Sequence, residues 1–110
     1  MSSRYVILHH TGFGEPHFDL MLEVPGQAGL RTIALACWPL SPGQSCPVRE
    51  LPAHRAAYLD YEGEVSGGRG RVARVETGTW HAQGELLVLT AATGGIARVR
   101  LRPGVATATS

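Results

Sequence analysis

The most informative chemical groups lie in a short stretch that begins at His17, where apolar and polar residues alternate. Successive side chains of a strand point to opposite faces, so His17 and Asp19 are neighbours on the face opposite the apolar residues. An imidazole beside a carboxylate on a rigid strand is half of a divalent-metal site. The sequence therefore predicts a metal site formed by His17, Asp19 and either His9 or His10, which end the preceding apolar run. The alternative is an ordinary His–Asp pair on a half-exposed strand.

The second candidate group is the segment HRAAY, residues 54–58. A spacing of four residues places His54 and Tyr58 on one face if the segment is helical, and residues 52–58 are the only ones with helical propensity. Histidine, arginine and tyrosine can together hold a phosphate and transfer a proton, which makes His54, Arg55 and Tyr58 candidate catalytic residues. The alternative is a helical turn in which the tyrosine packs and the histidine faces water.

Arginine residues form a third set of candidates. All ten basic residues of the chain are arginine, and residues 67–110 carry six of them against two acidic residues. Within the glycine-rich segment 66–71, Arg69 and Arg71 lie two residues apart and would share one face of a strand. Glycine-rich backbone and guanidinium groups both bind anions, so Arg69 and Arg71 are candidate phosphate-binding residues. The alternative is a set of solvated surface charges.

These groups must be positioned by a small fold. The 110 residues correspond to one domain, residues 1–110, because domains typically have about 100–200 residues. Fourteen glycines and seven prolines divide the chain into short segments of strand character. We expect an all-β fold with minor α content: a small antiparallel β-barrel of about seven or eight short strands with one short helix over residues 52–58. The tail, residues 105–110, is expected to be frayed.

Composition excludes several classes of protein. Two cysteines are too few for a disulfide scaffold. No apolar run approaches the roughly 18 residues of a membrane-spanning helix, and the first apolar run is too short for a secretory signal. The chain is therefore expected to be a cytoplasmic monomer with no membrane partner.

Three separated motifs occur in an order that resembles the 3′-phosphoesterase domain of bacterial ATP-dependent DNA ligase D. The first is YVILHH, ending at His10, followed by HFDLMLE from His17. The second is HRAAYLDYEG from His54, and the third is ETGTW, ending at Trp80. Together they cover most of residues 4–80, and their shared order makes the likeness more specific than any single motif.

The resemblance implies a manganese-dependent phosphoesterase that removes a 3′ phosphate or 3′ ribonucleotide from DNA or RNA in non-homologous end joining. At the matching positions, His10, His17 and Asp19 are the metal ligands, for Mn²⁺ or for another divalent ion such as Zn²⁺. His54 matches the histidine that engages the phosphate opposite the metal, and Tyr58 matches a tyrosine of the same site. The implied partners are nucleic-acid 3′ ends, together with end-joining ligase and polymerase proteins.

Met21 departs from the family pattern, which has an arginine at this position. Strand alternation places Met21 on the face of His17 and Asp19, so we expect it to line the groove that binds the phosphate. Removing one positioned donor costs about 10²–10³ in rate in oxyanion holes, so weak turnover is expected here. Met21→Arg is expected to raise turnover without changing metal affinity. In the natural chain, Arg55 or Arg69 would have to supply the missing charge.

Two alternatives to the phosphoesterase remain open. A site that has lost its chemistry would be a module that binds nucleic-acid ends without turnover. His17 and Asp19 with the distant His54 also mimic the two-histidine, one-carboxylate site of non-haem iron oxygenases, although the chain is short for that fold. Manganese or zinc with phosphatase turnover would favour the phosphoesterase, whereas iron with oxygen consumption would favour the oxygenase.

Overall fold

The structure is a computed structural model and describes residues 3–110. It consists of nine strands and one short 3₁₀ turn, η1. Their bounds are β1 (Ser3–Thr11), β2 (His17–Glu23), β3 (Gly29–Leu35), β4 (Ser45–Arg55), η1 (Ala56–Leu59), β5 (Gly63–Glu64), β6 (Arg71–Gln83), β7 (Leu86–Ala91), β8 (Ile96–Arg102) and β9 (Val105–Thr109). None of the helical segments in this range is long and apolar enough to cross a membrane.

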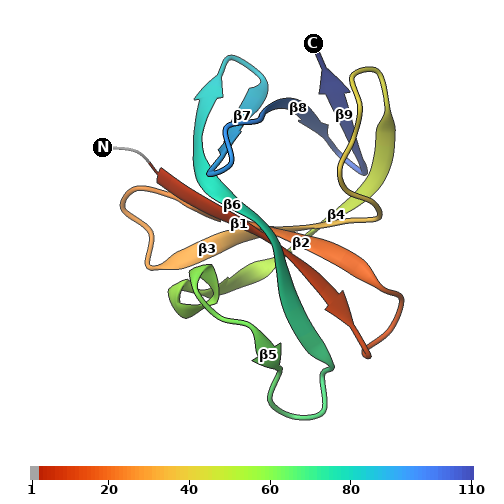
Figure 1. Ribbon diagram of the computed structural model, residues 1–110, viewed down its shortest axis with the longest axis vertical. Helices are drawn as coiled ribbons and strands as arrows, with labels where there is room; N and C mark the ends of the chain where they lie inside the picture. Colours follow the sequence, from red (N-terminus) through yellow and green to blue (C-terminus); the bar gives the residue numbers. More distant parts are fainter. Residues whose placement is uncertain (1–2) are drawn as a thin grey trace.

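Eight of the strands close into an antiparallel barrel, which confirms the expected fold class. Neighbours pair in the order β1-β2-β3-β4-β9-β8-β7-β6, and β6 pairs back with β1. The 13 residues of β6 allow this closure, because the first part of the strand pairs with β1 and the last part with β7. The two-residue β5 adds to β6 outside the ring. In Figure 1, η1 and β5 lie on one side of β1, β2 and β3, while β7, β8 and β9 lie on the other.

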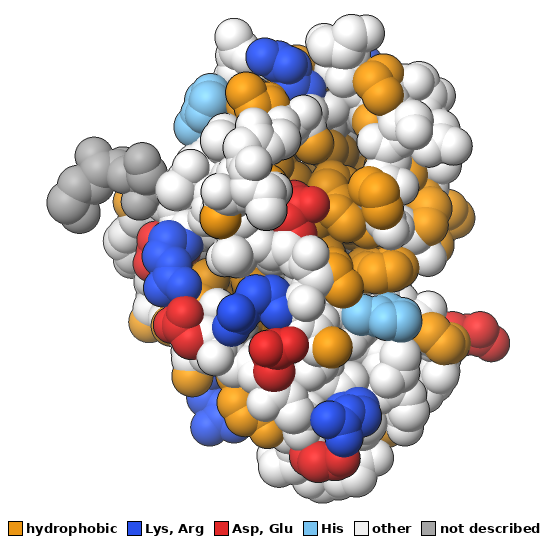
Figure 2. All heavy atoms as spheres, in the orientation of Figure 1, with side chains coloured by type: hydrophobic (Ala, Val, Ile, Leu, Met, Phe, Trp, Pro, Cys, Tyr) orange, Lys and Arg blue, Asp and Glu red, His pale blue; other side chains and the backbone are white. Residues whose placement is uncertain are grey.

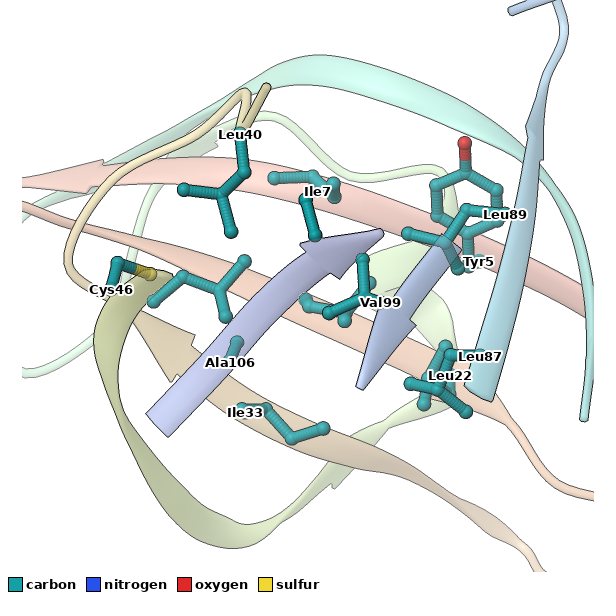
Figure 3. Close-up of a cluster of buried hydrophobic side chains, with 13 residues drawn as sticks. Tyr5, Ile7, Leu22, Ile33, Leu40, Cys46, Leu87, Leu89, Val99 and Ala106 are labelled. Carbon is teal, nitrogen blue, oxygen red and sulfur yellow. The ribbon is translucent and has the colours of Figure 1, made fainter. Parts of the chain in front are cut away.

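Alternate side chains of the strands fill the barrel interior, as the period of two in the sequence predicts. Figure 3 shows this cluster, in which residues from β1, β2, β3, β7, β8 and β9 meet. Phe18, Leu20 and Leu22, expected on one face of β2, all belong to it or pack against it. The same pattern leaves His17 and Asp19 on the outer face of the barrel wall.

A second apolar cluster covers part of that outer face. It contains Val6 and Leu8 from β1, Met21 from β2, Leu30 from β3, Leu59 from η1 and Val72 from β6. Both faces of β1 are therefore buried, which explains why this strand reads as an unbroken apolar run. The segment between β4 and β6 supplies the cover, so the outer wall beside the candidate site is a packed surface.

Two local predictions are wrong, and tertiary pairing is the reason for each. Residues 52–55, expected in a helix, belong to β4, where His54 and Arg55 pair with Leu30 and Gly29 of β3. Pro52 also biases the residue before it toward extended backbone. Only η1, a single 3₁₀ turn, follows. The tail is not frayed either: β9 pairs with both β4 and β8 and buries its two alanines inside the barrel.

One acidic side chain, Glu76, faces the barrel interior. The Tyr5 hydroxyl donates a hydrogen bond to one carboxylate oxygen at 2.6 Å, and the Trp38 indole nitrogen donates to the other at 3.1 Å. Burial, and secondarily the bond to Glu76, raises the pKa of the Tyr5 phenol well above its ordinary value. The carboxylate is thus satisfied by two neutral donors, as buried polar groups require.

Candidate metal centre

The register of β1 and β2 brings the predicted metal ligands together. His10 lies directly across from His17, and Leu8 lies across from Asp19. The two imidazole rings meet edge to face with centroids 4.9 Å apart. One ligand atom from each of His10, His17 and Asp19 lies within 4.8 Å of the others. Asp19 is 2% exposed and the histidines are half-buried, so the group is largely shielded from solvent.

Backbone carbonyls fix the proton positions of both histidines. Nε2 of His10 lies 2.7 Å from the Arg69 carbonyl, and Nδ1 of His17 lies 2.9 Å from the Glu15 carbonyl. A carbonyl oxygen can only accept, so these nitrogens carry the protons. In the neutral rings, Nδ1 of His10 and Nε2 of His17 therefore present lone pairs. Such outer hydrogen bonds are what orients histidines that bind metals.

Both lone pairs face the Asp19 carboxylate. Nδ1 of His10 lies 3.4 Å from Oδ2, and Nε2 of His17 lies 3.0 Å from Oδ1. Oδ1 is buried and has no hydrogen-bond donor among residues 3–110. Two lone pairs aimed at a carboxylate repel it unless a cation stands between them or the rings are protonated. Ligands about 2.1 Å from a metal, at octahedral or tetrahedral angles, are about 3.0–3.4 Å apart, so the two spacings between histidine and carboxylate match those around a divalent ion.

The ambiguity between His9 and His10 is resolved by strand alternation. His9 points to the opposite face, where its ring stacks on Phe18 with centroids 4.7 Å apart and an interplanar angle of 15°. His9 is not part of the group that could hold a metal ion, whereas His10 is. On the site's own face, the ring of Phe13 is 53% exposed and lies parallel to that of His10, with centroids 6.3 Å apart. No pattern in the sequence distinguishes Phe13.

A close approach of two loops positions the carbonyl that holds His10. Gly70 has a φ of +80°, and a Cβ atom there would lie 2.1 Å from the Thr11 carbonyl oxygen. This contact lets the turn before β6 pack against the end of β1, with the Arg69 carbonyl on Nε2 of His10. The sequence predicts that the glycine-rich segment binds phosphate through its backbone and arginines. It does not predict that the Arg69 carbonyl holds the His10 ring.

Gly70→Ala is expected to lower the free energy of unfolding by about 2–5 kcal/mol. The left-handed conformation costs an L-residue about 1–2 kcal/mol, and forced overpacking adds about 1–3 kcal/mol. Gly68→Ala is the matched control, because Gly68 has a φ of +69° but open space around its Cβ position. Chemical denaturation of both variants measures the difference. Equal losses for the two would contradict the close contact at Gly70.

His54 and Tyr58 lie on the outer face that carries the candidate metal-binding group, but apart from it, and Arg55 ends β4 next to His54. His54 pairs with Leu30, which lies four residues along β3 from Ala34, the partner of Asp19. Four residues correspond to about 13 Å along a strand. Nδ1 of His54 bonds the Pro52 carbonyl, which leaves Nε2 free for a ligand. The segment is not a helix, but the rings of His54 and Tyr58 still meet edge to face, with centroids 5.7 Å apart.

Most of the predicted phosphate-binding side chains have partners within the protein. The Arg69 guanidinium bonds the carbonyl and hydroxyl of Ser66, and Arg71 bonds Glu64 at 2.9 Å. Figure 2 shows the same trend on one face, where Lys/Arg and Asp/Glu side chains lie side by side instead of separating by sign. Arg55 is exposed and makes no ion pair within residues 3–110.

Met21 does not line a groove, contrary to the expectation. It shares the strand face of Asp19, but it is 1% exposed and belongs to the cluster that includes Leu59 of η1. Alternation predicts the face correctly and does not reveal that the segment between β4 and β6 covers it. The Met21 side chain is therefore not accessible to a ligand on this face.

Comparisons with known proteins leave the chain without an assigned family. No family model matches it, and no curated protein matches it. The chemistry of the metal centre must therefore be inferred from its donor atoms and their surroundings.

Proposed function

We propose that this protein is a divalent-metal-dependent phosphoesterase that acts on the 3′ ends of DNA or RNA, with Mn²⁺ as its metal. The observation that supports the proposal best is the convergence of two oriented histidine lone pairs on the buried Asp19 carboxylate, whose Oδ1 has no hydrogen-bond donor among residues 3–110. Two nitrogen donors and one oxygen donor suit Mn²⁺ or Zn²⁺. The substrate class comes from the order of motifs in the sequence, and a role in end joining or DNA repair follows from the same likeness.

When bound, a divalent ion polarises a phosphoryl oxygen and lowers the pKa of its water. His10, His17 and Asp19 hold the ligand atoms in place, and the Arg69 and Glu15 carbonyls keep the two rings oriented. Arg55, the candidate without an ion-pair partner among residues 3–110, supplies positive charge toward the substrate. Because Nδ1 of His54 donates to the Pro52 carbonyl, Nε2 is an acceptor in the neutral ring, and the protonated ring can donate through Nε2 to a phosphate oxygen that reaches this part of the face. Tyr58 orients the His54 ring through their edge-to-face contact.

A second candidate is a module that binds nucleic-acid ends without turnover. Burial of Met21 and the internal partners of Arg69 and Arg71 favour it, because they leave few free positive groups near the metal centre. Phosphoryl transfer depends chiefly on positioned positive charge, and each missing donor costs about 10²–10³ in rate. The two candidates share a binding face and differ only in turnover.

The test is a 5′-labelled primer–template that carries a 3′ phosphate or a single 3′ ribonucleotide, incubated with Mn²⁺. We expect a slow conversion to the 3′ hydroxyl that stops when a chelator is added or when His17 is changed to alanine. His81→Ala is the matched control, because His81 is exposed on β6 and is not part of the metal-binding group. Product formation that survives His17→Ala would refute the proposal. Tight binding without product would favour the end-binding module.

A further inference from the structure

We infer that a cavity beside η1 binds the terminal nucleoside of the nucleic-acid end, an inference that rests on the proposed function. The cavity has a volume of about 260 Å³ and is lined by Arg55, Ala57, Tyr58, Tyr61, Glu64 and Ser66. This volume lies just below the range of about 300–1,000 Å³ that is typical of ligand sites, which limits the occupant to a single small unit such as one nucleoside.

Two tyrosine rings give the cavity walls suited to a flat base. Tyr58 and Tyr61 meet edge to face at 89°, with centroids 5.7 Å apart. Tyr58 packs against the outer apolar cluster, and the Tyr61 hydroxyl donates a hydrogen bond to the Glu64 carbonyl, so both rings are held in place. Tyr61 nevertheless remains 39% exposed. Held, exposed aromatic rings are the surfaces on which proteins stack unpaired bases.

The charges around the cavity suit a nucleotide. Glu64 is neutralised by its ion pair with Arg71 at 2.9 Å. Arg55 has no ion-pair partner among residues 3–110 and is free to bond a backbone phosphate. An aromatic wall with one free guanidinium fits a base that is joined to a phosphate.

One turn connects the cavity with the metal centre. Ser66 lines the cavity, and its carbonyl accepts a hydrogen bond from Nε of Arg69 at 2.7 Å. The carbonyl of Arg69 in turn accepts from Nε2 of His10. The ends of such a four-residue turn lie within about 7 Å of each other. The turn that lines the cavity through Ser66 is therefore the same turn that holds the His10 ring through the Arg69 carbonyl, so the cavity and the candidate metal centre share one structural element.

The test measures binding without metal, so that it does not depend on turnover. The probes are two 5′-fluorescein single-stranded DNA octamers with a 3′ phosphate, one with a normal terminal nucleoside and one with an abasic terminal residue. By fluorescence anisotropy in chelator, we expect the normal octamer to bind about tenfold tighter, within the range that stacking of one base produces. Tyr61→Ala should abolish this preference, whereas Tyr61→Phe, which keeps the ring, should retain it.

Ala57→Trp provides a second variant, because Ala57 is exposed and a large side chain there should fill the cavity. It should also abolish the preference for the normal octamer. Equal affinity of the wild-type protein for both octamers would overturn the inference, as would an equal loss on both octamers in Tyr61→Ala. A preference in binding without any Mn²⁺-dependent product would refute the phosphoesterase and leave the nucleoside site standing. Equal affinities for the two octamers, together with equal product formation from both, would refute the nucleoside site and leave the phosphoesterase standing.

Discussion

Asp19→Asn is expected to lower the affinity for Mn²⁺ more than about 100-fold, beyond the 10–100-fold typical for loss of an outer-shell partner. The substitution keeps the shape of the side chain and removes its charge. Asp19 is 2% exposed, and both histidine lone pairs face its oxygens. Without the carboxylate, the two imidazoles retain no anionic partner with which to neutralise a divalent ion.

Thermal unfolding gives a second readout of the same change. A ligand at 100 times its Kd stabilises a protein by about 2.7 kcal/mol, so Mn²⁺ should raise the Tm of the wild-type protein and leave that of Asp19→Asn unchanged. Without metal, Asp19→Asn should be at least as stable as the wild-type protein, because it removes a buried charge.

Asp60→Asn is the matched control for Asp19→Asn. Asp60 is exposed, and within the described part of the chain its carboxylate forms an ion pair with Arg4 alone, so its loss should leave the response to metal intact. Equal titration curves for Asp19→Asn and the wild-type protein in calorimetry would show that Asp19 is not a ligand.

Met21→Arg is expected to destabilise the protein by at least about 4 kcal/mol. This expectation replaces the gain in turnover that the family resemblance implies. Removing a buried methionine side chain costs about 2–5 kcal/mol, and burying an unpaired guanidinium costs several more. The nearest strand partners of Met21 are Val6 and Thr32, which offer no charge to pair with. Asp19 lies two residues away on the same face, so a guanidinium that reached it would compete with the metal.

Chemical denaturation and metal titration of Met21→Arg measure the two effects together. Met21→Leu is the control, because exchanges that conserve volume usually cost less than about 1.5 kcal/mol. A folded Met21→Arg protein with higher turnover and unchanged metal affinity would restore the original expectation. It would also mean that η1 moves away from β2 and opens the face.

Much of the fold could be predicted, because local patterns follow the strand period. Alternation in residues 17–23 indicates both the inward apolar residues and the outward His17 and Asp19. The secondary structure of two segments was predicted wrongly, because their local sequence does not indicate the strand that tertiary pairing produces. The small residues of β9 have little hydrophobicity of their own and become strand through pairing with β4 and β8. His54 and Arg55 have helical propensity, and pairing with β3 overrides it.

By itself, the sequence determined that an imidazole and a carboxylate share one face of a strand and that short strands make up the fold. Only the tertiary structure decided that His10 joins them and that Met21 is covered. It also decided that the carbonyl of Arg69, 59 residues along the chain, orients the His10 ring. The physical reason is that the direction of a side chain follows from the backbone of its own strand. Burial, register and outer hydrogen bonds depend on segments that meet only after the barrel has closed.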